Sequence, residues 1–466
     1  MLDVVEIAGK SILPLVEGGK GVSATNGKSA GAWAAAGGLG TVSAVNADSY
    51  DNEGQIISQI YQGKTRIQRH EELVKFGIEG GVTQAKIAHD ISSGKGLINI
   101  NILWEMGGAQ RVLEGILKRT KGIVNGVTCG AGMPYKLAEI TAKFGVFYYP
   151  IVSSARAFKI LFKRAYYKFT DNLGGVVYED PWLAGGHNGL SNSEDPEKPQ
   201  KALPRVRELR KLMSEIGLAK TIPIIIAGGV WRLDEWEDCI ENPDLGSIAF
   251  QFGTRPLLTR ESPIPEAWKK RLLSIKKGEV FLHRFSPTGF YASAVKNDFI
   301  NELESRSQRQ VIFSNEKILE KGLIEKVAIG NGNRQIFVTA QDKNRINSWI
   351  REGYTEGLKT PDNTMIFVSL SKAREIRKDQ IDCMGCLSQC KFSNWSDNEK
   401  HTTGKKVDPR SFCIQKTLQD IVHDKGTENQ LMFAGHNAWR FSQDPFYSNG
   451  FVPTVKQLVD RILSGA

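Results

Sequence analysis

Eight short apolar runs recur along the first half of the chain, each bounded by Gly, Pro, Asn or another polar residue. Runs of this length that are rich in Val, Ile and Leu are typical of buried parallel strands. The predicted strands are Ile12–Glu17, Leu39–Ala44, Leu97–Leu103, Ile123–Thr128, Val146–Val152, Gly174–Glu179, Ile222–Ala227 and Leu245–Phe252.

Segments with helical spacing of apolar residues lie between these runs. This strand–helix alternation, repeated about eight times over about 250 residues, predicts a (β/α)8 TIM barrel. A doubly wound open sheet is the competing fold, but the first βα turn carries no convincing G-x-G-x-x-G fingerprint. The predicted helices are Gly27–Ala36, Thr83–Ser92, Ala109–Thr120, Tyr135–Phe144, Ala155–Tyr166, Leu203–Ile216 and Leu233–Glu241.

The pattern changes after the break at Ser262–Pro265. We expect residues 1–262 to form the barrel, 263–432 an inserted α+β region with a Cys-rich loop, and 433–466 a helical segment that returns to the barrel. The elements predicted beyond the barrel are the helices Trp268–Lys277, Asn297–Arg306 and Pro453–Ser464, the strands Gln335–Thr339 and Met365–Ser369, and the loop Asp382–Cys413.

Composition supports a globular protein, since 41% of the residues are apolar and 24% are charged. The net charge is 61 − 51 = +10, yet Lys and Arg are scattered without a long basic run. We therefore expect no nucleic-acid partner, because a polyanionic cofactor or an acidic substrate explains the charge equally well.

The start of the chain carries Asp3 and Glu6 within its first apolar stretch, which does not resemble a signal peptide. No window approaches about 18 uninterrupted apolar residues, so we expect no membrane span and a cytoplasmic protein. The six cysteines are then predicted to be thiols or metal ligands and not disulfides.

Polar and glycine residues follow the ends of the predicted strands, where barrels place their active sites. Gly228-Gly229 and Gly253-Thr254 follow strands seven and eight, the usual position of a phosphate. A single Gly-Gly pair would indicate only a tight turn, whereas two such sites on adjacent strands favour a phosphate. His187 follows Gly185-Gly186 and is predicted to be a general acid/base, with a structural histidine as the alternative.

An ordered set of fragments resembles the nitronate monooxygenase (2-nitropropane dioxygenase) family, including its flavin-dependent enoyl-acyl carrier protein reductase branch. The resemblance covers about residues 10–262 and resumes near Ser286–Gly289 and Lys296-Asn297. The fragments are Leu15–Gly19, Ala36–Gly40, Asn99, Val127–Gly132, Ala184–Gly189, Ile226–Val230 and Phe252–Arg255.

This resemblance implies an FMN-binding barrel with His187 as the catalytic imidazole. Gly228, Gly229, Gly253 and Thr254 would hold the FMN phosphate. Residues around the isoalloxazine and ribityl would be Glu17, Gly18, Gly19, Asn99 and Glu179, and Gly130 completes the predicted cofactor site.

Two residues depart from the family pattern. Relatives usually carry Gln or Ala at the position of Glu17, and an apolar residue such as Met at that of Lys20. Lys20 could stabilise an anionic reduced flavin or simply form an ion pair with Glu17. The region between Pro263 and about Met432 is also longer than the family requires, which leaves the substrate open.

Four cysteines form the pattern Cys383-x2-Cys386-x3-Cys390, followed by Cys413. Tight thiolate spacing in a cytosolic chain usually indicates metal, and this mixed spacing favours a [4Fe–4S] cluster over zinc. The string resembles the iron–sulfur loop of the 2,4-dienoyl-CoA reductase group, although the spacing to the last cysteine differs. Zinc and unligated thiols are the alternatives. We expect a metal to order this polar loop, which has no apparent core of its own.

Three functions follow from these features. The first is FMN-dependent oxidation of a small nitronate-like substrate with O2. The second is NAD(P)H-dependent reduction of an enoyl thioester, in which the basic surface could dock an acidic acyl carrier protein. The third is a non-catalytic flavin or iron–sulfur electron-transfer protein, against which His187 argues. The sequence does not indicate an oligomeric state.

Overall fold

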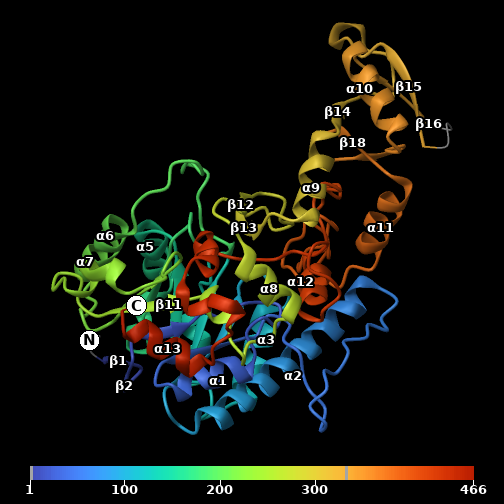
Figure 1. Ribbon diagram of the computed structural model, residues 1–466. Coiled ribbons are helices and arrows are strands. Elements are labelled where there is room, and N and C mark those ends of the chain that lie inside the picture. Colours follow the sequence, from blue (N-terminus) through green and yellow to red (C-terminus); the bar gives the residue numbers. More distant parts are fainter. Residues whose placement is uncertain (1–3, 331–333, 466) are drawn as a thin grey trace.

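The structure is a computed structural model that describes residues 4–330 and 334–465. Eight parallel strands close into a barrel, with each strand followed by its helix or loop on the outside (Figure 1). The predicted barrel is therefore confirmed. In barrel order its strands are β3 (Leu15–Glu17), β4 (Leu39–Ser43), β5 (Leu97–Leu103), β6 (Gly126–Gly130), β7 (Phe147–Val152), β8 (Val176–Glu179), β10 (Ile224–Ala227) and β11 (Ile248–Phe252).

Alternate residues of each strand point into the barrel, because side chains alternate across a strand. The interior holds a compact apolar cluster, and a short hairpin of β1 (Val5–Ile7) and β2 (Lys10–Ile12) adds Ile7 and Ile12 to it. The side chains that point outward pack against the surrounding helices. The strands contributing to the interior cluster do so through Val16, Leu39, Leu97, Tyr149, Val177, Ile225, Ala227 and Ala249.

Two barrel helices differ from the prediction. α2 starts at Arg66 and not near Thr83 as predicted, because Thr65 and Gln68 form a capping box there. The predicted helix Leu233–Glu241 is instead a 3-10 turn followed by the single α-turn of α7. The barrel helices are α1 (Gly27–Ala35), α2 (Arg66–Ser92), α3 (Ala109–Arg119), α4 (Leu137–Lys143), α5 (Ala155–Arg164), α6 (Ala202–Glu215) and α7 (Glu237–Ile240).

Beyond the barrel, α8 (Glu266–Ser274) leads into a three-stranded antiparallel sheet over the barrel mouth. Its strands are β12 (Val280–His283), β13 (Ala292–Val295) and the two-residue β9 (Gly186–His187), which comes from the loop after β8. This sheet was not predicted. It joins the post-barrel region to the loop that carries His187.

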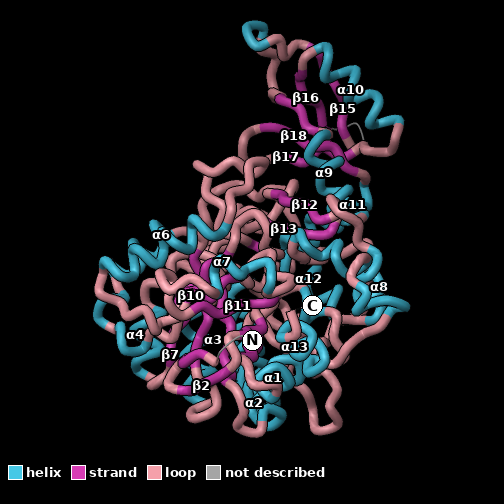
Figure 2. The backbone as a smooth tube through the Cα atoms, turned by 60° about the vertical axis from the view of Figure 1, so that its left-hand side comes forward, coloured by secondary structure: helices cyan, strands magenta, loops and turns pink. Residues whose placement is uncertain are grey.

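A lobe projects away from the barrel in both overall views (Figures 1 and 2). It follows α9 (Asp298–Gln308) and contains a three-stranded sheet and a separate hairpin. Only two of its strands were predicted. Its elements are β14 (Gln310–Ile312), β15 (Glu325–Ile329), β16 (Arg334–Val338), α10 (Ala340–Arg351), β17 (Glu356–Lys359), β18 (Thr364–Val368) and α11 (Leu370–Ile381).

The chain then returns to the barrel through the cysteine segment 382–413 and α12 (Ile414–Val422). The last helix, α13 (Val455–Leu463), packs its apolar face against α1. No helix in the described part of the chain is both long and apolar enough to cross a membrane.

Candidate active site

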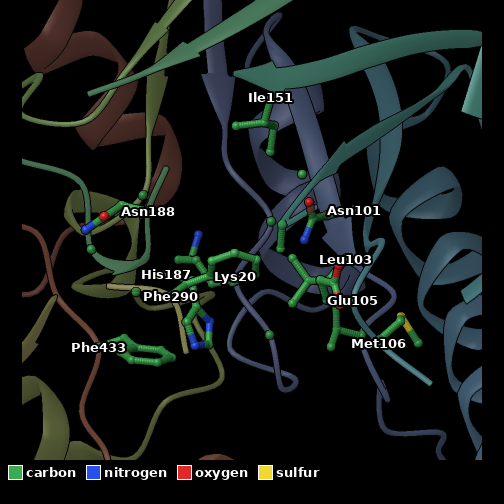
Figure 3. A pocket seen from close by; sticks show the side chains of 18 of the residues that line it. Lys20, Asn101, Leu103, Glu105, Met106, Ile151, His187, Asn188, Phe290 and Phe433 are labelled. Atoms are coloured by element: carbon green, nitrogen blue, oxygen red, sulfur yellow. The ribbon is translucent and has the colours of Figure 1, made fainter. Parts of the chain in front are cut away.

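Two adjoining hollows lie at the carboxyl ends of the barrel strands. The larger is a cavity of about 800 Å³, and the smaller holds about 120 Å³. Figure 3 shows His187 and Phe433 on one side of the larger cavity and Asn101 and Leu103 on the other. The two hollows share several lining residues, among them Gly19, Lys20, Glu179, Gly253 and Thr254.

Backbone turns after β10 and β11 form the smaller hollow. Gly228 and Gly229 have φ of +85° and +78°, a region that L side chains rarely adopt. A Cβ on Gly229 would also lie 2.6 Å from Leu183 Cδ1. Gly253 and Thr254 line the same hollow from β11. Its size and glycine backbone fit a phosphate group, which is the role predicted for these four residues.

Three residues of the C-terminal segment, Gly435, Asn437 and Ala438, also line the smaller hollow, and sequence reasoning missed them. The N–H of Gly435 donates to Thr254 Oγ1 at 2.8 Å, and Asn437 Nδ2 donates to the Gly229 carbonyl at 2.6 Å. Both lie about 200 residues from the turns that they contact. The only signal for them was the predicted return of residues 433–466 to the barrel.

Gly18 and Gly19 continue from β3 into the smaller hollow, and Gly19 also lines the larger one. A Cβ on Gly19 would lie 2.4 Å from Asn101 Cβ, so only glycine fits there without movement. Gly130 ends β6 and, like His187, lines the larger cavity. These three predicted cofactor residues thus share one region with Asn101, which the prediction did not include.

Glu17 and Asn99 do not line either hollow. Glu17 points outward from β3, where its Oε1 accepts hydrogen bonds from Ser29 Oγ at 2.5 Å and Lys20 Nζ at 3.1 Å. Asn99 is fully buried inside the barrel, two residues before Asn101 on β5, and its side-chain amide has no hydrogen-bond partner. The sequence predicts both residues around the flavin, and the structure places neither side chain on the surface of the two hollows.

Lys20 links Glu17 to the cavities. Its Nζ donates to Glu17 and, at 2.8 Å, to the Gly18 carbonyl, while the side chain lines both hollows. Burial lowers the pKa of Lys20, and the charge of Glu17 acts in the opposite direction. The ion pair considered from the sequence is present, and it places the ammonium beside the cavities.

Glu179 ends β8 and lines both hollows. Burial raises the pKa of Glu179 to about 8, and the neighbouring Asp180 charge acts in the same direction. A carboxyl group with this pKa is mostly protonated at neutral pH, so Glu179 can donate a hydrogen bond to a ligand.

His187 lies on β9, where β13 pairs with it through Ala292. Its Nε2 lies 2.6 Å from Ser286 Oγ, and its ring meets the Phe433 ring edge-on with centroids 5.5 Å apart. Burial lowers the pKa of His187 to about 4. The imidazole is thus neutral at neutral pH, oriented by a hydroxyl and exposed to the cavity.

The post-barrel region supplies another wall of the larger cavity. Leu387, Ile414 and Leu418 line it, the latter two from α12. Asn46 Nδ2 donates to Gln415 Oε1 at 2.8 Å, which fixes the start of α12 against the loop after β4.

The four predicted metal-ligating residues, Cys383, Cys386, Cys390 and Cys413, are free thiols that share one apolar cluster. Their loop was expected to lack a core, but it packs around Trp395, which is fully buried. The described residues include no group of three or more His, Cys, Asp or Glu side chains placed to bind a single metal ion.

The fold is a (β/α)8 barrel with both hollows at the carboxyl ends of its strands, where enzymes of this fold place their active sites. The family model described as nitronate monooxygenase matches residues 6–352, and the chain belongs to this family. The predicted family and the predicted class of FMN-dependent oxidoreductase are confirmed. A search of curated proteins finds no match.

Solved structures share the fold at low sequence identity. FabK from Thermotoga maritima is 15% identical, with a TM-score of 0.51 over 97% of this chain and 92% of FabK. The enoyl reductase domain of MlnA from Bacillus amyloliquefaciens is 12% identical, with a TM-score of 0.52 over 97% of this chain and 93% of the domain. Nitroalkane oxidase from Streptomyces ansochromogenes is 19% identical, with a TM-score of 0.44 over 62% of this chain and 78% of that chain.

Proposed function

We propose that the protein binds FMN and oxidises a nitronate-like substrate with O2. The observation that carries this proposal is the glycine-lined hollow, which adjoins a cavity bordered by a neutral imidazole. When bound, FMN would supply the electron-accepting ring.

The residues present fit FMN. Gly228, Gly229, Gly253 and Thr254 would hold the phosphate, because their turns offer backbone N–H groups without obstructing side chains. Gly18, Gly19 and Gly130 leave room for the flavin where the two hollows meet, and protonated Glu179 would donate a hydrogen bond to it. Asn101 is added to this predicted set.

His187 is the proposed catalytic base. A neutral imidazole can accept the proton from the α-carbon of a bound nitroalkane, which leaves the nitronate as the species to be oxidised. Ser286 holds Nε2 at 2.6 Å, and Thr288 Oγ1 lies 2.8 Å from the Ser286 hydroxyl, so the ring has a fixed orientation. Lys20 would attract an anionic substrate toward the same cavity.

A second candidate is NAD(P)H-dependent reduction of an enoyl thioester. The cavity of about 800 Å³, with mainly apolar walls, exceeds the needs of a small nitronate and supports an acyl chain. The likeness to the MlnA enoyl reductase domain extends over nearly the whole chain. An acyl carrier protein, which is acidic, would find a basic partner in this chain of net charge +10.

One anaerobic experiment distinguishes the two candidates. The purified flavoprotein is mixed in turn with a nitronate, NADH and NADPH, and flavin bleaching is followed. Rapid bleaching by the nitronate alone, reversed by O2, supports nitronate oxidation. Bleaching by NAD(P)H that an enoyl thioester reverses favours the second candidate. A protein that contains no flavin, even after incubation with FMN, would contradict both.

A further inference from the structure

Lys20 lies on the turn between β3 and α1 and lines both hollows. Thr25, later in the same turn, holds its backbone from both sides. The Lys20 N–H donates to Thr25 Oγ1 at 3.0 Å, and the Thr25 N–H donates to the Lys20 carbonyl at 3.1 Å. The turn therefore fixes the direction in which the Lys20 side chain leaves the backbone.

The Lys20 ammonium is bonded within its own turn. Its Nζ donates to Glu17 Oε1 at 3.1 Å and to the Gly18 carbonyl at 2.8 Å. An ammonium group has three N–H donors. The described residues thus take up two of them, which leaves one N–H for a ligand in the hollows.

Glu17 holds the ammonium without reaching the hollows itself. The Glu17 side chain is 1% exposed and lines neither hollow, whereas that of Lys20 is 16% exposed and lines both. Glu17 Oε1 also accepts a hydrogen bond from Ser29 Oγ in the first turn of α1, where a helix favours a negative charge. The positive end of the ion pair therefore faces the hollows.

The wall shared by the two hollows carries a net positive charge. Besides Lys20, the residues that line both hollows are Gly19, Glu179, Gly185, Gln251, Gly253 and Thr254. Glu179 is the other ionisable residue among them, and its raised pKa of about 8 keeps it mostly protonated at neutral pH. The charge of Lys20 is therefore not cancelled on this wall.

We propose that Lys20 raises the reduction potential of bound FMN. Reduction by two electrons and one proton leaves the flavin ring with one negative charge, and a positive charge beside the ring stabilises this form relative to the oxidised one. The ring is expected where the two hollows meet, within reach of the Lys20 ammonium. This inference rests on the proposed FMN site, and it holds for either candidate reaction because both reduce the same ring.

Substitutions at Lys20 and Glu17 should shift the potential in a fixed order. The double variant Glu17→Gln/Lys20→Met removes both charges, which avoids a lone buried charge and so preserves the fold. Lys20→Met alone leaves the Glu17 carboxylate uncompensated, so its potential should be lower still. Lys20→Arg keeps the positive charge and should restore most of the wild-type potential.

The experiment measures the midpoint potential of the FMN-loaded, full-length proteins by anaerobic reduction with dithionite against a reference dye. In the double variant, the affinity for reduced FMN relative to oxidised FMN should fall about tenfold. This corresponds to a potential about 30 mV below wild type for a two-electron couple. An unchanged potential in the double variant, or a Lys20→Arg potential as low as that of Lys20→Met, would overturn the proposal.

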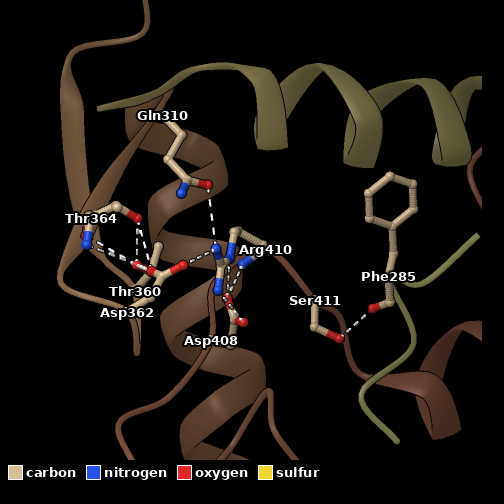
Figure 4. Close-up of polar contacts among 8 residues, drawn as sticks. All are labelled: Phe285, Gln310, Thr360, Asp362, Thr364, Asp408, Arg410 and Ser411. Carbon is tan, nitrogen blue, oxygen red and sulfur yellow. Dashed lines mark hydrogen bonds and ion pairs between the residues drawn. The ribbon is translucent and has the colours of Figure 1, made fainter. Parts of the chain in front are cut away.

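An ion pair away from the hollows provides the matched control. Figure 4 shows Arg410 bonded to Asp362 of the projecting lobe and to Asp408, and Arg410 lines neither hollow. Arg410→Met should therefore leave the potential unchanged, and a shift equal to that of the double variant would contradict a local effect of Lys20.

The same samples separate this inference from the proposed reaction. Because dithionite reduces the flavin without a substrate, a nitronate that fails to bleach the wild-type flavin refutes nitronate oxidation alone. A bound flavin whose potential does not respond to Lys20 refutes the role of Lys20 alone. A wild-type protein that takes up no FMN refutes both.

Discussion

At the scale of single residues, His187 lines the larger cavity, and its hydrogen bond with Ser286 fixes the orientation of its ring. We predict that His187→Ala lowers turnover of a neutral nitroalkane, whose α-proton the base must remove, about 10²- to 10⁴-fold, as expected for loss of a general base. FMN content should not change, because His187 does not line the phosphate hollow. His89→Ala, on the exposed face of α2, is the matched control. Equal turnover in both variants would make His187 structural.

The pH dependence of turnover follows from the same imidazole. Burial lowers the pKa of His187 to about 4, so its neutral, proton-accepting form persists well below the ordinary titration range of histidine. We predict that kcat/KM for a neutral nitroalkane is insensitive to the ionisation of His187 from neutral pH down to about pH 5. It should then fall about tenfold per pH unit once the ring becomes protonated. Initial rates measured across this pH range test the prediction. A fall in kcat/KM that begins near pH 6.5 would contradict it, because about 6.5 is the pKa of an imidazole exposed to water.

Glu17 and Lys20 are predicted to act as a coupled pair. Glu17→Gln leaves a largely buried ammonium without its carboxylate, and Lys20→Met leaves a buried carboxylate without its cation. Each change should lower the free energy of unfolding by about 3 kcal/mol, and the double variant should recover most of the loss. Denaturant unfolding of the four proteins measures this coupling. Additive losses would show that the two charges are independent.

The sequence placed residues at strand ends but did not fix which way they point. Glu17 and Asn99 were predicted to lie around the flavin because of their position and the family resemblance. Glu17 instead faces α1, and Asn99 lies inside the barrel below Asn101. One residue along a strand reverses the direction of a side chain, and two residues change its depth, so small register differences decide such roles.

At the scale of elements, the two turns after β10 and β11 are together predicted to bind the FMN phosphate. Thr254→Glu should abolish FMN binding, because it places a carboxylate against the phosphate. Thr254→Ser is the control, since it keeps the hydroxyl that accepts the Gly435 N–H. Flavin content after incubation with FMN is the measurement. Full FMN binding by the Thr254→Glu variant would contradict the proposal that the FMN phosphate lies in this hollow.

Regular strands were predictable at this scale, whereas short or distant pairings were not. All eight barrel strands were found because their apolar runs are buried on both faces. β9 has only two residues and owes its existence to pairing with β13, about 100 residues later. The start of α2 was missed because Thr65 and Gln68 cap a polar first turn that lacks apolar periodicity.

At the scale of the whole molecule, the region after the barrel supplies walls of both hollows. Gly435 and Asn437 line the smaller hollow, and α12, which precedes them in the same region, lines the larger cavity. Asp48 and His423, whose Oδ2 and Nε2 lie 2.9 Å apart, add a second contact between α12 and the loop after β4. The region whose length left the substrate open therefore forms part of the cavity in which we propose that the substrate binds.

The cavity size predicts how the enzyme responds to substrate length. The apolar walls of the cavity include Ile414 and Leu418. If they receive an alkyl chain, burial of each added methylene contributes about 0.8 kcal/mol to the binding free energy. We predict that kcat/KM for linear nitronates rises about fourfold per methylene until the part of the cavity that the flavin leaves free is filled, and then levels off. Initial rates across a homologous series measure this, with a branched isomer of each length as the shape control. A kcat/KM that falls from the shortest member onward would mean that only small nitronates enter, and that the cavity serves another ligand.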